Sequence, residues 1–333
     1  MTAKVLVNVD RNNVSESAHR GWVVACDNRG KILAGTHKKF PDVFARSSIK
    51  PVQALPFLFA DGLETFSFGI KELSVMCSSH SGEEIHVKTV SSILKKIKLT
   101  EKHLKCGIHN PYGVEANNHL IKTNTQPSEI HCNCSGKHSG MLAACLISGW
   151  TLHDYYDYNH PLQKEIRQHI QNLTGLKSDN LNWGIDGCGV PTYSMPLNKI
   201  AEIFAKISNP NHDLSPKYQQ IFNLIKEAFF EYPEIIAGTN RVDTQIMCAN
   251  RNKYISKIGG EAVLALGIPN EKKAFAIKIE DGANRPLLPV IIKTLELLKQ
   301  DVSNPELQKL AITNVENNSK QVVGKVYPVF SFI

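Results

Sequence analysis

A serine and a lysine three residues apart, Ser47 and Lys50, are the first residues along the chain that could do chemistry. In the first turn of a helix this spacing puts a hydroxyl and an amine on one face. A neutral lysine, whose pKa is lowered by burial or by a second cation, can take the proton of a serine nucleophile. A capping serine beside a solvated lysine explains the pair equally well. Arg46 and a second serine cluster shift the balance towards chemistry.

The second serine cluster covers residues 78–83 and reads Ser-Ser-His-Ser-Gly-Glu. A helix end followed by the cap of the next helix would explain its serines and its glutamate, but not His80. Further on, Lys257-Ile-Gly259 follows a predicted strand, where glycine permits the close approach of a ligand or another backbone. A Lys-x-Gly strand beside a Ser-x-x-Lys helix is the arrangement of penicillin-binding proteins and serine β-lactamases, whose middle Ser-x-Asn element is not evident here.

Two further segments place glycines around a cysteine and offer a metal site: Cys134-Ser-Gly-Lys137-His138 and Asp186-Gly-Cys188-Gly. Two thiolates with one or two nitrogen ligands suit Zn²⁺. The chain has no Cys-x₂-Cys pair, so small residues buried in glycine-bounded turns are an equally good interpretation. Cys132 beside Cys134 is equally well read as an idle reduced pair.

Two polar clusters each hold an arginine near an aspartate, at residues 238–244 and 280–285. For both we expect a structural ion pair that shapes a loop, Arg241 with Asp243 and Arg285 with Asp281.

The composition favours a folded protein with a large hydrophobic core. The chain has 333 residues, of which 42% are hydrophobic and 21% charged, so a large core is expected and disorder is not. The net charge of +7 is a mild bias, and the lysine cluster at residues 95–98 reads as a solvated helix face rather than a nucleic-acid site. No signal peptide or membrane span is evident, so we expect a cytoplasmic protein with reduced cysteines.

Strand patterns gather at both ends of the chain and helix patterns lie between them. Strands are predicted at residues 4–10, 22–25, 32–35, 254–258, 262–267 and 273–280. Helices are predicted from Ser47 or Ser48 onwards and at residues 71–76, 84–97, 137–147, 161–172, 197–207, 216–230 and 286–299. The prediction is an α/β (α+β) fold in one intertwined unit. An antiparallel sheet is built from about residues 1–45 and 250–333, and a mainly helical part from about 46–249 is inserted between them.

Taken together and in order, these segments resemble the rhizobial-type, or class 3, L-asparaginases. The resemblance runs through residues 15–17, 46–53, 79–83, 133–140, 186–191, 238–244 and 257–259. It covers nearly the whole chain, and its motifs are specific jointly although each is weak alone. It implies a β-lactamase-like fold, a homodimer, and hydrolysis of L-asparagine to L-aspartate and ammonia.

The resemblance further implies two Ser–Lys tandems that face one site, Ser47 with Lys50 and Ser79 with Lys257. One serine is expected to attack the side-chain amide carbon while the lysines relay its proton to the leaving ammonia. Backbone N–H groups near the serines would hold the oxyanion. Ser47 is the expected nucleophile because its lysine is one helical turn away, and Ser79 is its rival.

The resemblance also implies a zinc ion, which is expected to position the substrate rather than to make hydroxide. Since lysine must lose its proton to bind a metal, this site should be sensitive to acid. The matching ligands are Cys134, Lys137 and Cys188. The α-carboxylate and α-amine of the substrate are expected to be held by Arg46, His138 and Asp186.

Two other classes of protein stay open. One is a serine acyl-hydrolase of the penicillin-binding type, which a fluorescent penicillin would acylate without release of ammonia from asparagine. The other is a non-catalytic zinc-binding protein on an enzyme fold, which would bind stoichiometric zinc and turn over no amide.

Overall fold

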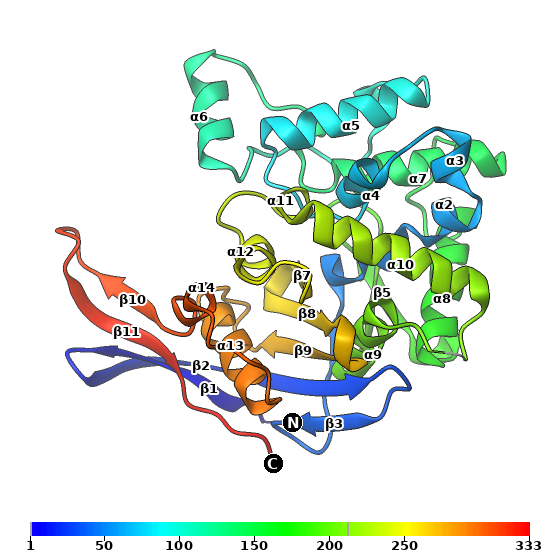
Figure 1. The fold of residues 1–333 in the computed structure, drawn as a ribbon. Helices are drawn as coiled ribbons and strands as arrows, with labels where there is room; N and C mark the ends of the chain where they lie inside the picture. Colours follow the sequence, from blue (N-terminus) through cyan, green and yellow to red (C-terminus); the bar gives the residue numbers. More distant parts are fainter. Residues whose placement is uncertain (1, 212) are drawn as a thin grey trace.

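The computed structural model describes residues 2–211 and 213–333 of the chain. Its main feature is an eight-stranded sheet in the order β10-β11-β1-β2-β9-β8-β7, with β3 paired to β2, and all its pairs are antiparallel. The strands are β1 (Lys4–Arg11), β2 (Val14–Asp27), β3 (Ile32–Gly35), β7 (Ile255–Gly259), β8 (Val263–Ile268), β9 (Lys273–Ile279), β10 (Thr313–Glu316) and β11 (Val322–Pro328). Both chain ends therefore build the sheet, which confirms the predicted α+β class (Figure 1).

The region between the two sets of strands is mainly helical (Figure 1). Its helices are α1 (Lys50–Gln53), α2 (Leu55–Phe59), α3 (Gly62–Thr65), α4 (Ile70–Met76), α5 (Glu84–Lys96), α6 (Val114–Lys122), α7 (Ser135–Ser148), α8 (Pro161–Thr174), α9 (Leu197–Ser208), α10 (Pro216–Glu231), α11 (Pro233–Ile236) and α12 (Val242–Ala249). Two more follow the sheet, α13 (Leu287–Leu297) and α14 (Pro305–Gln308). A 3₁₀ helix, η1 (Arg46–Ile49), leads into α1.

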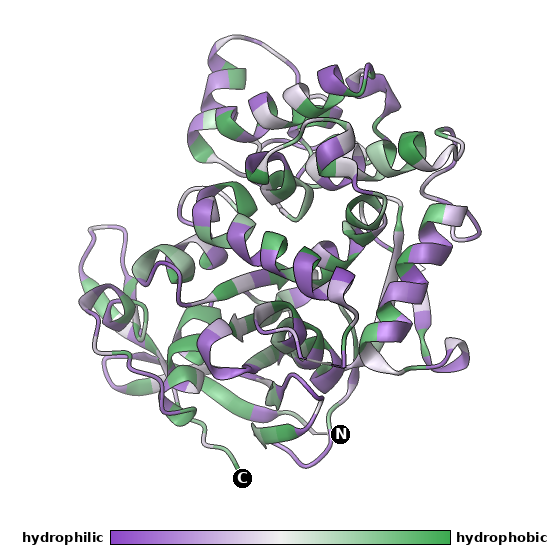
Figure 2. Cartoon of the chain, turned by 45° about the vertical axis from the view of Figure 1, so that its right-hand side comes forward, coloured by the Kyte–Doolittle hydropathy of each residue, from purple (hydrophilic) through white to green (hydrophobic). Residues whose placement is uncertain are grey.

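The two faces of the central sheet bury different sets of side chains because neighbouring residues of a strand point to opposite faces. On β2, Val24 and Cys26 belong to the larger core beneath α9, whereas Val23 and Ala25 belong to the smaller core beneath α13. The strands β7, β8 and β9 are buried nearly throughout, while polar residues are frequent on the covering helices (Figure 2). The sheet is thus a rigid layer, and the helical region attaches to it through α9.

Three features of the fold were not predicted from the sequence. The first half of β2 pairs with β1 as a projecting ribbon whose side chains are mostly exposed, so it has no apolar alternation to detect. β10 and β11 were not predicted for the same reason, because they are short or half-exposed. A small antiparallel sheet lies inside the helical region, in the order β4-β6-β5, with β4 (Asp42–Phe44), β5 (Asn182–Ile185) and β6 (Pro191–Pro196).

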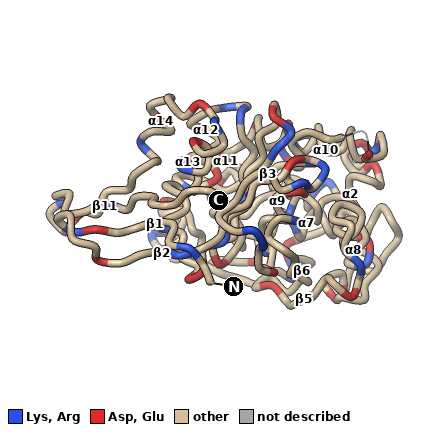
Figure 3. Tube along the Cα trace, turned by 90° about the horizontal axis from the view of Figure 1, so that it is seen from below, with Lys and Arg blue, Asp and Glu red and all other residues tan. Residues whose placement is uncertain are grey.

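The charged residues are spread over the trace, with Lys and Arg interspersed among Asp and Glu (Figure 3). In the part of the chain that the structure describes, no helix has the length and apolar character needed to cross a membrane.

Candidate active site

The segment that follows α4 carries Ser79 into the interior. Its backbone is fixed on both sides, because Ser79 N–H donates to Ile236 O at 2.9 Å and His80 N–H donates to Asn133 O at 3.2 Å. The Ser79 side chain is 4% exposed, and its hydroxyl has no hydrogen-bond partner within the described residues. A buried polar group without a partner is uncommon, so this hydroxyl needs an explanation beyond packing.

His80 serves to hold this segment in place. Its Nδ1 accepts from the Gly82 N–H at 3.1 Å, so its Nε2 carries the proton and donates to Ser135 Oγ at 2.8 Å. Burial, with repulsion from His86 and Lys50, holds the pKa of His80 well below its usual range. The imidazole is therefore neutral and ties the serine cluster to the start of α7.

Ser47 and Lys50 lie on consecutive elements, η1 and α1, and their side chains have different surroundings. Lys50 is fully buried, and its Nζ donates to Ser78 O at 2.5 Å and to Asn133 O at 3.1 Å. Ser47 is half-buried, and no hydrogen bond joins its hydroxyl to Lys50 in the described structure. Lys50 therefore points beneath the Ser78–Ser79 segment, rather than back towards Ser47.

Lys257 is the second buried lysine of the site. It lies on β7 with no exposed surface, and its Nζ donates to Ile258 O at 2.9 Å. The Nζ is 3.6 Å from Asp243 Oδ2. Burial is the main cause that lowers the pKa of Lys257 to about 8, and the charges of Lys50 and Arg241 add to it against the attraction of Asp243. A fraction of this amine is therefore neutral near pH 7 and can act as a base.

The β7 strand and η1 approach closely at Gly259. A Cβ on this glycine would lie 2.8 Å from Ala45 O and 3.1 Å from Ser48 N. Since side chains two residues apart share one face of a strand, Lys257 points to the same side as this contact. The Lys-x-Gly motif thus lets the strand bearing Lys257 pack directly against the turn bearing Ser47.

Asp243 pairs with Lys257 rather than with Arg241. The ion pair expected within residues 238–244 was therefore predicted with the wrong partner. Asp243 Oδ1 accepts from Ser256 Oγ at 2.8 Å and its Oδ2 from the Ile258 N–H at 3.0 Å. No ion pair links Arg241 to Asp243 in the described residues. The expected pair of Arg285 with Asp281 is likewise replaced, because Asp281 Oδ2 lies 2.8 Å from His19 Nδ1.

The hairpin between β5 and β6 brings Asp186 and Cys188 to the same region. Its turn closes through the Asp186 N–H to Val190 O and the Gly189 N–H to Asp186 O, both at 2.9 Å, and Gly189 has a φ of 86°. This conformation favours glycine, which explains the residue after the cysteine. Asp186 Oδ1 accepts from Arg46 Nε at 2.7 Å and from the Gly187 N–H at 2.8 Å.

The three predicted metal ligands lie together. Cys134 precedes α7, Lys137 is in its first turn, and both are buried. Lys137 Nζ lies 2.8 Å from the Sγ of the buried Cys188. Hydrogen bonds from the thiols of Cys132 and Cys188 hold the pKa of Cys134 well below its usual range. Within residues 2–211 and 213–333, no three His, Cys, Asp or Glu side chains form a metal-binding group, so a site here needs the lysine as its third donor.

His138 follows Lys137 and is fully buried. Its Nδ1 is 2.7 Å from the hydroxyl of Tyr155, and its Nε2 has no partner among the described residues. Burial, then the charge of Lys137, lowers the pKa of His138 well below its usual range, so the ring is neutral.

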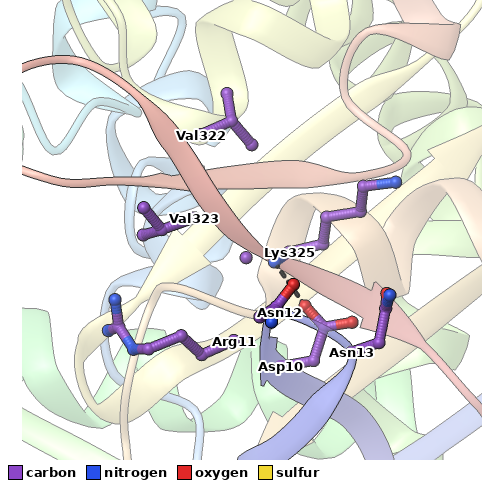
Figure 4. A pocket seen from close by; sticks show the side chains of 8 residues that line it. Asp10, Arg11, Asn12, Asn13, Val322, Val323 and Lys325 are labelled. Carbon is purple, nitrogen blue, oxygen red and sulfur yellow. Dashed lines mark hydrogen bonds between the residues drawn. The ribbon is translucent and has the colours of Figure 1, made fainter.

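A pocket of about 490 Å³ is lined by other residues and lies between the β1–β2 turn and β11 (Figure 4). It is lined by Asp10, Arg11, Asn12, Asn13, Val322, Val323, Gly324 and Lys325. None of the predicted site residues borders it, so we place no chemistry there.

The sequence profile of the L-asparaginase II family matches residues 7–328 of the chain. The chain belongs to the L-asparaginase II family. A search among curated proteins finds no match. Membership makes the protein an enzyme, an amidohydrolase of the L-asparaginase type.

Amide hydrolysis, the reaction type of the L-asparaginase II family, would use the buried polar groups of this chain together. Hydrolysis of an amide needs a nucleophile, a base for its proton and donors for the oxyanion. The described structure holds a hydroxyl without a partner, an amine with a lowered pKa and a buried ammonium in neighbouring segments.

The ion pair between Lys257 and Asp243 generates a prediction about stability. Asp243→Ala should lower the free energy of unfolding by about 3–5 kcal/mol, because it leaves a buried ammonium, a hydroxyl and an N–H without their acceptor. Urea unfolding at neutral pH measures the change. The control is Glu234→Ala, which breaks the half-exposed pair of Glu234 with Arg251 and should cost about 0–1 kcal/mol. Equal losses in the two variants would contradict the structural role of Asp243.

Proposed function

We propose that this protein hydrolyses the side-chain amide of L-asparagine to L-aspartate and ammonia, using both Ser–Lys tandems. The observation that carries the proposal is the buried Ser79 hydroxyl, which has no hydrogen-bond partner in the described structure and follows Ser78, whose carbonyl accepts from the buried Lys50. Family membership supports the reaction, and the geometry supports these residues as its agents.

Ser79 is our proposed nucleophile, which reverses the preference for Ser47 drawn from sequence. That preference depended on Lys50 lying one helical turn from Ser47, but Lys50 Nζ is engaged with the carbonyls of Ser78 and Asn133. Lys257 is the better base, since burial lowers its pKa to about 8 and leaves a fraction of the amine neutral near pH 7. Ser47, held against β7 by the close contact at Gly259, would then relay protons within the site.

The reaction follows from these roles in two halves. Ser79 Oγ bonds to the amide carbon while its proton passes to Lys257, and the carbon–nitrogen bond breaks as the leaving ammonia takes that proton. This leaves an aspartyl ester on Ser79. Water then attacks the ester carbonyl while Lys257 takes one of its protons, and that proton returns to Ser79 Oγ as the ester bond breaks, which releases L-aspartate and restores the free serine.

The oxyanion needs a donor, and the backbone N–H groups expected for this purpose are partly in use. Those of Ser48 and Ser79 donate to the carbonyls of Ala45 and Ile236. The Lys50 ammonium has three N–H groups and uses two of them on protein carbonyls. Its third N–H is our proposed oxyanion donor, and a charged donor of this kind is a strong one.

The substrate's α-ammonium is proposed to bind Asp186, which retains acceptor capacity beyond its contact with Arg46. Arg46 would orient Asp186, and the buried Nε2 of His138 would contribute a polar contact behind it.

The Cys134, Lys137 and Cys188 side chains are proposed to hold Zn²⁺. Two thiols and an amine within contact of one another match the sulfur and nitrogen donors that zinc prefers. When bound, the ion would supply a fixed positive charge that orients the substrate. The reaction steps proposed above use only the side chains of the chain itself.

The remaining parts of the resemblance are proposals as well: a β-lactamase-like arrangement, a homodimer and a cytoplasmic location. The homodimer is supported by the ribbons β1–β2 and β10–β11, which project from the body and expose the apolar Val14 and Val322 (Figure 1).

An ammonia-release assay with L-asparagine tests the function directly. Ser79→Ala should lower kcat by about 10⁴-fold or more, because it removes the atom that forms the ester. Ser47→Ala should lower it by about 10²-fold, in the range of a lost proton relay. Mass spectrometry of the quenched enzyme should find the acyl adduct on Ser79. An adduct on Ser47 would restore Ser47 as the nucleophile, and no ammonia from the wild type would end the proposal.

The lowered pKa of Lys257 predicts the pH dependence of the reaction. A base acts when unprotonated, so kcat/KM should rise with pH and level off above an apparent pKa of about 8. Thermal unfolding over the same pH range is the control for loss of the folded enzyme. A rate that is flat from about pH 6 to pH 9 would remove Lys257 from the role of base.

The zinc proposal is tested by metal content. The purified protein should hold about one zinc per chain by elemental analysis, and Cys134→Ser or Cys188→Ser should lose it. Cys248→Ser is the matched control, because this thiol lies elsewhere and hydrogen-bonds to Glu234. Retention of zinc in all three variants would show that the ion binds at another place.

A further inference from the structure

Arg241 is a cation in the site region that no carboxylate of the described residues neutralises. It immediately precedes α12 and is half-buried. Its Nη1 donates to Ser81 Oγ over a long 3.5 Å, and its guanidinium lies 5.3 Å from the centroid of the Tyr112 ring. These contacts fix the plane of the guanidinium and leave most of its five N–H groups free for another acceptor.

Glu83, an acidic side chain that contacts the loop before Arg241, already accepts two hydrogen bonds. Glu83 Oε1 accepts from the Thr239 N–H at 2.8 Å, and its Oε2 accepts from Thr239 Oγ1 at 3.1 Å. Asp243 is turned towards Lys257 and Ser256. Neither of these two carboxylates forms an ion pair with Arg241 in the described residues.

The second arginine of the site differs in this respect. Arg46 is paired with Asp186 at 2.7 Å, so its charge is largely balanced inside the protein. An anionic group of a ligand would have to compete with Asp186 for Arg46, whereas Arg241 offers it a full positive charge without competition.

Arg241 is also next to the proposed reaction centre. The segment that leads to it runs beside the serine cluster, as the contacts of Ser79 N with Ile236 O and of Ser81 Oγ with Ala237 O show, both at 2.9 Å. Gly238 packs against Ser81 so closely that a Cβ there would lie 2.5 Å from Ser81 Oγ. Arg241 therefore contacts Ser81, which is two residues along the chain from Ser79.

We infer that Arg241, oriented by Ser81 and Tyr112, binds the α-carboxylate of the substrate. This subsite rests on the proposed function, and it replaces Arg46 as the carboxylate partner expected from the sequence. It defines the substrate class as a small amide that bears a free carboxylate. An amide whose carboxylate is blocked, as within a peptide, would leave the guanidinium without its anion.

Three ligands separate this role from a structural one. L-Aspartate and succinamic acid carry the carboxylate, and 3-aminopropanamide is asparagine without it. Arg241→Met should weaken L-aspartate binding, measured by calorimetry, by about 10²-fold, as expected for a lost charged hydrogen-bonded pair. It should lower kcat/KM for L-asparagine and succinamic acid by a similar factor, chiefly through KM. The inhibition constant of 3-aminopropanamide should be unchanged.

The controls keep the result interpretable. Arg241→Lys retains the charge without the planar fork and should lose only about tenfold. Arg251→Met removes an arginine paired with Glu234 at the other end of α12 and should change nothing. If Arg241→Met weakens all three ligands equally, or none of them, the carboxylate subsite is wrong. If the wild type binds L-aspartate but releases no ammonia from L-asparagine, the proposed function fails while the subsite stands.

Discussion

Lys50 holds a positive charge inside the protein, where its Nζ donates to the carbonyl oxygens of Ser78 and Asn133. A buried ammonium is costly unless its N–H groups are satisfied, so these two carbonyls must stay where they are. They belong to the serine cluster and to the loop before α7, and Lys50 itself belongs to the turn after η1. One charge therefore ties three segments, distant in sequence, into one site.

The same charge sets the chemistry of the second lysine. Asp243 favours the protonated form of Lys257, but burial and the nearby Lys50 oppose that attraction and bring its pKa to about 8. Burial and a positive neighbour thus make it easier for Lys257 to lose its proton, whereas two carbonyl acceptors hold the amine of Lys50 in place. Two residues of one type are thus proposed to serve as the oxyanion donor and the base.

The sequence was enough to predict the sheet from both chain ends and most of the helices, because those elements bury one face and show it as periodicity. It also identified the segments that meet at the site. It could not predict which partner each charge has, since Asp243 is two residues from Arg241 yet lies against Lys257 through the fold. The projecting half of β2 and the β4-β6-β5 sheet escaped because exposed or very short strands carry no apolar alternation.

The two arginines of the site differ in their partners, and only Arg241 has no anionic partner among the described residues. The site has five basic side chains, Lys50, Lys137, Lys257, Arg46 and Arg241, and the carboxylates of Asp186 and Asp243 face two of them. Thiols surround Lys137 and carbonyls surround Lys50, so both have acceptors. Arg241 alone among them has only a hydroxyl at long range and an aromatic ring. A bound carboxylate would satisfy this arginine, and an amino-acid amide brings such a group together with the amide that Ser79 is proposed to attack.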